Sequence, residues 1–215
     1  MKELVNAYKI VQYGTKIGMQ FGMALLFLAL GIVLEFLTRG TQSVGSFYIV
    51  LSGMFLYQMI VSSDISTLVQ SSPYKKKIQC TYPLLAVIPW IVVTLAIVCG
   101  LHCYFAATSG PDGYIEQGQQ LIILGLCIFI LMVYFGIAYK YFITATVVMI
   151  IFVMAVMFVV TGAYSNEYFV APSLGFCVAF AWIAAVLGFV CCKVLTNLLY
   201  KKDLSKLAFR GMTRK

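Results

Sequence analysis

The chain has 215 residues, of which 62% are hydrophobic and 10% are charged, with a mean hydropathy of +0.98 and a formal net charge of +8. Soluble domains usually carry about a quarter charged residues, so this chain would expose an apolar surface in water. The composition therefore predicts an integral membrane protein. The basic residues flank apolar runs and no nucleic-acid-binding signature is present, so we expect a lipid bilayer, and no nucleic acid, as their partner.

Six apolar windows approach or exceed the roughly 20 residues that cross a bilayer as a helix. They predict an all-α integral membrane protein with six transmembrane helices and no separate soluble domain. The stretch 120–163 is too long for one crossing, so we expect it to turn back at Lys140, which lies between two tyrosines. The windows are 17–38, 46–63, 83–106, 120–139, 141–163 and 171–198.

The basic residues fall on one side of this arrangement. Of the 15 Lys and Arg residues, all but Arg39 and Lys193 lie in 1–16, 64–82, Lys140 or 199–215. Basic loops stay in the cytoplasm, so we predict a multi-pass protein of the cell membrane with both termini cytoplasmic. Lys193 can extend to the same interface from the last window.

Residues 1–16 show a helical pattern that predicts an amphipathic helix lying flat at the headgroups. Leu4, Ala7, Tyr8 and Val11 share one face of it. The alternative is a charged leader that runs directly into the first span.

The seven cysteines are odd in number, and all but Cys80 fall within predicted spans. They indicate small apolar residues and not a disulfide framework. Cys99, His102 and Cys103 share a helical face with a spacing that could bind a soft metal, but no fourth ligand is in view. We therefore predict no metal, and expect His102 to be hydrogen-bonded or solvated near the outer interface.

Segment 64–82 is the largest internal loop on the basic side. Asp64 or Ser66 could cap a short helix, Ser71-Ser72-Pro73 would end it, and Pro83 would open the next span. A short amphipathic element beside a rigid turn suits docking of a soluble partner. The alternative is a solvated loop whose lysines only set the topology.

An acidic residue after the second helix, the stretch LVQSSPYKKKIQ and the C-terminal LYKKDLSK form a pattern that resembles the permease subunits of bacterial type-2 ABC exporters, the small six-helix kind. The resemblance implies that 1–16 is a connecting helix, 199–215 a basic tail and 64–79 a coupling helix that docks into a separate ABC ATPase present in two copies. The short 164–170 departs from members with re-entrant helices there. The implied docking residues are Asp64, Leu68, Ser72, Pro73, Tyr74, Lys75, Lys76 and Lys77.

The sequence contains no G-x-x-x-x-G-K-[ST] phosphate loop, so we expect the chain not to be an enzyme and to bind no cofactor itself. ATP and Mg²⁺ would be bound by the partner ATPase.

Several small and polar residues lie within the predicted spans. Gly18 and Gly22 allow close helix approach, either within one subunit or at a seam with a second permease copy or paralogue, as in type-2 exporters, whose first and fifth helices meet across the pathway. Glu35 is predicted to form an ion pair with Arg39 four residues on, with a proton or cation role as the alternative. Residues that could line a pathway, or bond between helices, are Gln20, Gln58, Thr146 and Thr161.

The sequence therefore favours an ATP-driven exporter permease that moves a hydrophobic or amphipathic cargo, with a peptide expected. The alternative is a six-helix substrate-binding subunit or small carrier, similar to a vitamin importer, which would need a deep polar pocket. An intramembrane enzyme would need paired acids with histidines in the spans, and the chain has one histidine.

Overall fold

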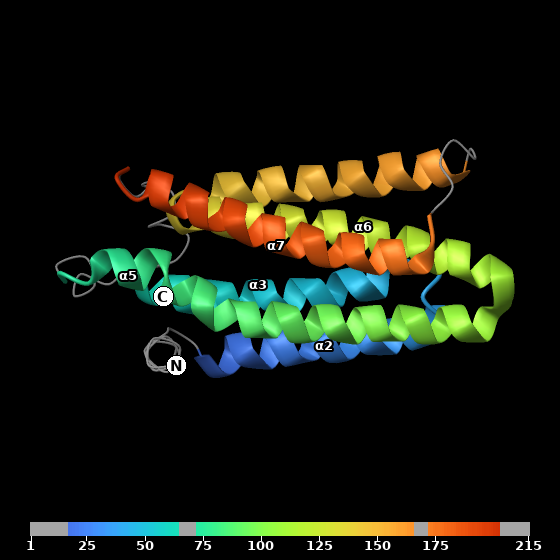
Figure 1. Ribbon diagram of the computed structural model, residues 1–215. Helices are drawn as coiled ribbons and strands as arrows, with labels where there is room; N and C mark the ends of the chain where they lie inside the picture. Colours follow the sequence, from blue (N-terminus) through green and yellow to red (C-terminus); the bar gives the residue numbers. More distant parts are fainter. Residues whose placement is uncertain (1–16, 65–71, 166–171, 203–215) are drawn as a thin grey trace.

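The computed structural model describes residues 17–64, 72–165 and 172–202, and these form an all-helical bundle (Figure 1). The predicted interfacial helix 1–16, the loop 166–170 and the tail beyond 202 lie outside the described residues. The predicted all-α class is confirmed for the described part. Its elements are α2 (Ile17–Thr38), α3 (Val44–Asp64), α5 (Lys75–Cys80), α6 (Tyr82–Ser165) and α7 (Leu174–Leu199).

Helix α6 folds back on itself twice. Its backbone leaves the helical region at Gly110 (φ 76°, ψ −165°) and at Tyr141 (φ −126°, ψ 55°), which gives three helical segments, 82–109, 111–140 and 142–165. These segments, α2, α3 and α7 run side by side along one axis of the bundle (Figure 1). The second reversal lies one residue beyond Lys140, where the sequence predicts a turn.

The predicted windows 83–106 and 120–139 leave residues 107–119 between them as a connection, but most of these residues are helical. The chain reverses at Gly110, whose positive φ is open to glycine and costly for residues with a β-carbon. Pro111 then begins the next segment, a position where its missing N–H leaves no helical bond unmade. A one-residue turn consequently brings residues of 107–119 into the bundle.

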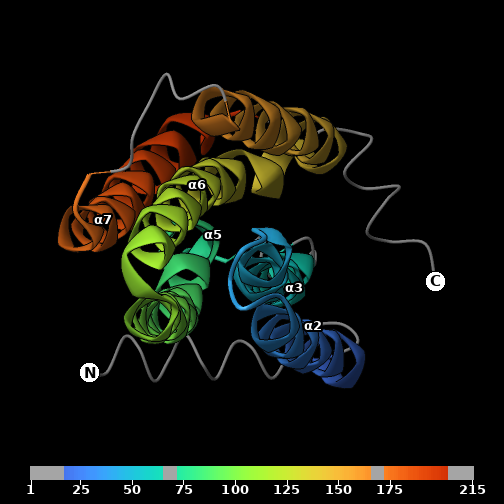
Figure 2. The same cartoon turned by 90° about the vertical axis from the view of Figure 1, so that its right-hand side faces the viewer.

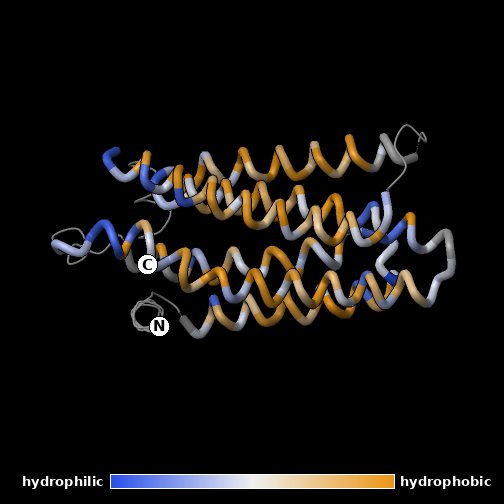
Figure 3. Tube along the Cα trace, viewed as in Figure 1, coloured by the Kyte–Doolittle hydropathy of each residue, from blue (hydrophilic) through white to orange (hydrophobic). Residues whose placement is uncertain are grey.

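The two ends of the bundle differ chemically. Lys75, Lys76, Lys77, Lys140, Lys201 and Lys202 gather at one end, which we call the lysine end. The turns at Gly40 and Gly110 lie at the opposite end, which we call the glycine-turn end. Hydrophobic residues fill the length between them (Figure 3). This distribution is the one expected of helices that pass through a bilayer.

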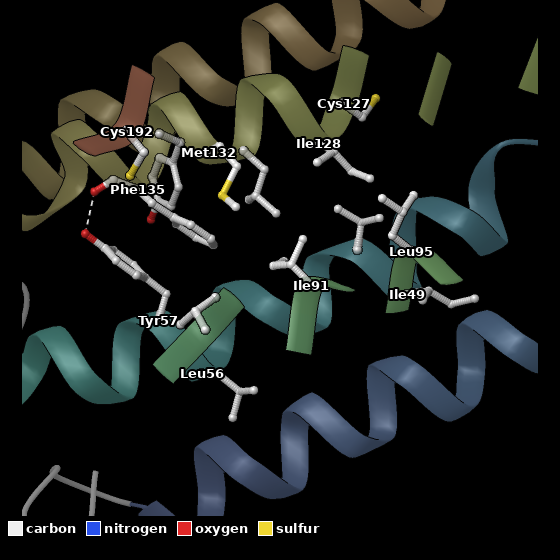
Figure 4. Packing of buried hydrophobic residues seen from close by; sticks show 14 of the residues in the cluster. Ile49, Leu56, Tyr57, Ile91, Leu95, Cys127, Ile128, Met132, Phe135 and Cys192 are labelled. Carbon is white, nitrogen blue, oxygen red and sulfur yellow. Dashed lines mark hydrogen bonds between the residues drawn. The ribbon is translucent and has the colours of Figure 1, made fainter. Parts of the chain in front are cut away.

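Seen from the glycine-turn end, α2, α3 and segment 82–109 form one group, and segments 111–140, 142–165 and α7 form the other (Figure 2). Their interface is the buried core. There the Tyr57 ring stacks on Phe135 with 4.2 Å between centroids, and its hydroxyl donates to the Phe135 carbonyl (Figure 4). Within the second group, Gly125, Gly136 and Gly188 allow α7 and segment 111–140 to approach closely.

The outer faces are apolar. Large hydrophobic side chains such as Leu37, Phe158, Val159 and Leu198 are each at least 67% exposed. Among the described residues, four helices are long and apolar enough to cross a membrane, and Val44–Met59 is a shorter apolar helix. Helices with such surfaces are stable when lipid solvates them, so the fold is that of a multi-pass membrane protein.

Candidate functional site

Polar side chains converge at the glycine-turn end because two hairpins fold about glycines. Glu35 and Ser46 lie at similar distances before and after Gly40, whose φ is +69°. His102 and Gln117 lie likewise before and after Gly110. Residues placed evenly about a tight turn sit at the same depth in antiparallel helices, so all four reach one level of the bundle.

These four side chains form a continuous buried chain of hydrogen bonds, which we call the polar network. The Ser46 hydroxyl donates to Glu35 Oε1 over 2.5 Å, and its Oγ lies 3.0 Å from His102 Nε2. His102 Nδ1 lies 2.5 Å from Gln117 Oε1. Glu35 and His102 are 0% exposed, Gln117 1% and Ser46 2%. The network therefore joins α2, α3 and two segments of α6.

The α2–α3 loop closes over the network. Gln117 Nε2 donates to the Arg39 carbonyl at 3.1 Å, and Gln120 Nε2 donates to the Thr41 carbonyl at 2.9 Å. Ser43 Oγ in turn donates to Gln120 Oε1 over 2.5 Å. Two glutamines of segment 111–140 thus satisfy loop carbonyls that would otherwise need water.

A missing β-carbon makes room for the carboxylate. A Cβ built on Gly45 would lie 2.8 Å from Glu35 Cγ and 2.9 Å from its Oε1. Gly45 is in the first turn of α3, where the partial positive charge of the helix N-terminus favours a nearby anion. Glycine at position 45 therefore leaves the space that the Glu35 side chain occupies.

The predicted ion pair between Glu35 and Arg39 is not the arrangement seen. The ion contact of Glu35 is with His102, 3.9 Å from Nε2 to Oε2, and the Arg39 side chain is exposed. Arg39 has a φ of 53°, so the helical spacing on which the prediction depended ends before it. The carboxylate points into the bundle instead.

The contacts of His102 lead away from the Cys99, His102 and Cys103 face on which a soft metal was considered. Both of its ring nitrogens face polar side chains of other segments, and Cys103 is exposed. Within the described ranges, no three His, Cys, Asp or Glu side chains gather as metal ligands. His102 is hydrogen-bonded, as expected, and fully buried.

A second candidate site lies at the lysine end. Ser72 and Pro73 form the expected turn, in which the Ser72 hydroxyl accepts from the Tyr74 backbone N–H at 3.1 Å. Helix α5 then begins at Lys75, so the lysines are helical and not in a loop. Tyr74 is 65% exposed, and Pro73, Lys76 and Lys77 are exposed as well. Leu68 and the Asp64 side chain lie outside the described residues.

Helix α5 is firmly connected to the bundle. Only Thr81 separates it from α6, and its Gln79 and Cys80 are buried. The Cys80 thiol lies 3.8 Å from the Thr196 carbonyl of α7, which also accepts from the Tyr139 hydroxyl at 2.7 Å. A displacement of α5 would therefore move segment 82–109 and the end of α7 with it.

Comparisons with protein-family models, with curated proteins and with solved structures give no match for this chain.

The structure brings two of the predicted pathway residues together. Gln58 and Thr146 both hydrogen-bond to Tyr134, the latter at 3.4 Å. Thr146 also borders a groove of about 870 Å³ between α3 and segment 142–165, lined mainly by apolar side chains that include four methionines. Gln20 lies apart in α2, and the Thr161 side chain lies outside the described residues.

Gly18 and Gly22 are exposed and do not pack against the described helices. No atom of the described residues lies within 4 Å of a Cβ built on either one. The small residues Ala181 and Gly188 of α7 are instead buried against segment 111–140.

Sequence reasoning missed Ser46, Gln117 and the role of His102 as their partner. A usable signal exists, because Glu35 is the one carboxyl and His102 the one imidazole in two predicted spans, and both lie near the ends that face the same side. A comparison of how far each residue lies from the end of its span would have placed Glu35 and His102 at the same level of the bundle.

Proposed function

We propose that the chain is the membrane permease subunit of an ATP-driven exporter of the bacterial type-2 ABC kind. It would cross the cell membrane six times with both termini in the cytoplasm and the lysine end facing inward. The observation that carries the proposal is α5, a lysine-bearing helix that projects at the lysine end and continues almost directly into a long apolar segment.

The mechanism follows from how α5 is attached. Closure of an ATPase dimer on ATP and Mg²⁺ would displace α5, which docks on the ATPase through Tyr74 and the lysines. Because Thr81 is the only break before segment 82–109 and Cys80 contacts α7, the displacement would reach both. The bundle would then shift between two packed arrangements, as two-state membrane machines do.

The exposed apolar surfaces support a hydrophobic or amphipathic cargo and a second permease copy or paralogue. The first and fifth long segments, α2 and 142–165, lie at the edges of the bundle with exposed faces. The methionine-bearing groove beside segment 142–165 offers unbranched side chains that adapt to varied apolar shapes. A peptide with an apolar face would suit this surface.

The alternative, a vitamin-importer-like binding subunit or small carrier, requires a polar pocket. The groove beside α3 and a smaller one of about 400 Å³ between segments 111–140 and 142–165 are both lined mainly by apolar residues. These linings favour the exporter.

The test is co-purification from native membranes in mild detergent. We expect a phosphate-loop ATPase to accompany the tagged wild-type chain and to be lost when Lys75, Lys76 and Lys77 are all changed to Glu. The matched control reverses Lys201 and Lys202, exposed at the same end but outside α5, and should retain the ATPase. Absence of any ATPase from the wild-type preparation would refute the exporter, and equal loss in both variants would refute docking through α5.

A further inference from the structure

A narrow apolar groove lies between segment 82–109 and α7, over Met132 of segment 111–140. Its volume is about 150 Å³, and all nine residues that line it are hydrophobic. The exposed side chains of Val92 and Val186 border its open side. The groove therefore opens toward the hydrocarbon that surrounds the bundle.

The size of the groove suits a single hydrocarbon chain. Along α7 its lining runs from Trp182 to Phe189, about 10 Å at 1.5 Å per residue. The acyl chains of one leaflet occupy about 15 Å, half of the hydrocarbon thickness, so much of one chain fits along the groove. A helix is about 10–12 Å across, which is too wide for this volume, so a helix of a second copy or of a peptide cannot enter it.

A lysine lies where the headgroup of such a lipid would be. Lys193 follows Phe189 by four residues and Trp182 by eleven, so the three side chains share one face of α7. Lys193 is therefore one helical turn beyond the groove, toward the lysine end, and its side chain is exposed. A lysine near the end of a span extends its amine toward the headgroups.

The other side of the groove ends at the same level. The Cys80 thiol contacts the Thr196 carbonyl, which places the start of segment 82–109 beside the last turns of α7. Lys193 consequently lies between that contact and the groove, close to where α5 joins the bundle. Lys201, eight residues further on and also exposed, adds a second positive charge at this end.

The charge of Lys193 is not compensated by a carboxylate of the described residues. The acidic side chains described, Glu35 and Glu116, both lie at the glycine-turn end, and the ion contact seen in the described ranges is that of Glu35 with His102. Positive side chains at the headgroup level attract anionic phospholipids. A zwitterionic headgroup carries its own cation and complements Lys193 less well.

From the groove and this charge we propose that the chain binds one anionic phospholipid of the leaflet at the lysine end. Lys193 pairs with the phosphate, and one acyl chain lies in the groove between segment 82–109 and α7. Because Cys80 and Thr196 meet just beyond the headgroup, the bound lipid strengthens the attachment of α5 to the bundle. The site does not depend on the exporter proposal.

Trp182 lines the groove, so its fluorescence reports an acyl chain there. The other tryptophan, Trp90, is changed to Phe, and the purified full-length protein is titrated in detergent with phospholipids brominated on their acyl chains, which quench tryptophan on contact. We expect brominated phosphatidylglycerol to quench Trp182 to saturation at a low mole fraction, and brominated phosphatidylcholine to quench only in proportion to its amount. Equal curves for the two lipids would overturn the proposal.

If Trp90→Phe does not fold, native mass spectrometry of the unchanged protein decides. We expect one molecule of phosphatidylglycerol to be retained in preference to phosphatidylcholine when both are offered in equal amounts. Equal retention of the two lipids would overturn the proposal.

Two lysine variants distinguish a specific site from the general attraction of a basic surface. Loss of one lysine beside an anionic headgroup weakens binding about fivefold, so we expect Lys193→Gln to shift the phosphatidylglycerol curve by about this factor. The control is Lys202→Gln, which removes an exposed charge at the same end but outside α7 and should bind as the parent protein does. An unshifted Lys193→Gln curve, or an equal shift in both variants, would contradict the site.

Two valine variants test the position of the acyl chain. Val92→Phe fills the groove from its border, whereas Val93→Phe places the same side chain at a neighbouring exposed position outside the groove. We expect Val92→Phe to reduce the saturable quenching of Trp182 and Val93→Phe to preserve it. Identical curves for the two variants would show that the chain lies elsewhere.

Discussion

The Tyr139 hydroxyl donates a 2.7 Å hydrogen bond to the backbone carbonyl of Thr196, which links the last turn of segment 111–140 to the end of α7. The same carbonyl is contacted by the Cys80 thiol of α5. Three parts of the lysine end therefore meet at one acceptor, and the proposed coupling would pass through this meeting point.

Tyr139→Phe should weaken the lysine end without disturbing the core. Removal of one interhelical hydrogen bond costs about 0.6–1.5 kcal/mol, and the Thr196 carbonyl keeps the backbone N–H of Tyr200 as a donor. Denaturant unfolding in detergent measures the loss. Tyr104→Phe is the control, because that side chain is 59% exposed, and it should unfold as wild type does. Equal stability of the two variants would contradict a role for the Tyr139 bond.

Gly40→Ala should destabilise the glycine-turn end. The backbone φ of +69° is unfavourable by about 1–2 kcal/mol for a residue with a β-carbon, and the new Cβ would lie 2.6 Å from Gln117 Oε1. We expect a lower unfolding midpoint and faster hydrogen exchange at residues 39–43.

The control for this substitution is Gly100→Ala. A Cβ at Gly100, which lies within a helical segment, meets no described atom within 4 Å, so the stability should stay within about 0.5 kcal/mol of wild type. A Gly40→Ala protein as stable as the control would show that the loop does not need this turn.

The long helices could be predicted from the sequence because the length of each apolar run is enough to indicate a membrane-spanning helix. The window 17–38 coincides with α2, and 46–63 lies within α3. The same reasoning located the reversal near Lys140, since a continuous helix there would be far longer than the bilayer is thick.

The polar network could not be predicted in this way, because its partners depend on turn length. A long loop over 107–119 would leave Gln117 in solvent, whereas a turn at Gly110 places it opposite His102. Glu35 was paired with its neighbour in sequence, although the closer partners come from α3 and α6. Local spacing describes one helix and carries no information on which helices meet.

Helix α5 illustrates the same limit at the lysine end. Ser72 and Pro73 correctly predict a turn, but the run of three lysines does not by its own pattern indicate a helix, and only the family resemblance implied one there. The segment is helical because its later residues, Gln79 and Cys80, are buried against α6 and α7, which is a tertiary effect.

Gly125→Leu should separate α7 from segment 111–140. A Cβ at Gly125 already lies 3.1 Å from the Ala181 Cα and from the Phe180 ring, and backbone cannot move aside as a side chain can. Overpacking of this kind costs about 1–3 kcal/mol. The matched control is Gly175→Leu, at the start of α7, where no described atom lies within 4 Å of the Cβ. Thermal unfolding in detergent should distinguish the two, and similar midpoints would show that this helix pair is loosely packed.

The arrangement of the chain in the membrane gives the last prediction. If the lysine end faces the cytoplasm, a cysteine at Lys76 should react with a membrane-impermeant maleimide only in inside-out vesicles, and one at Gln42 only in intact cells. Both positions are exposed, at opposite ends of the bundle. The seven native cysteines are first changed to alanine, and the unsubstituted background, which should not label, is the control. Labelling of position 76 in intact cells would invert the arrangement, and α5 could then not meet a cytoplasmic ATPase. Labelling of both positions from the same side would exclude the crossing pattern itself.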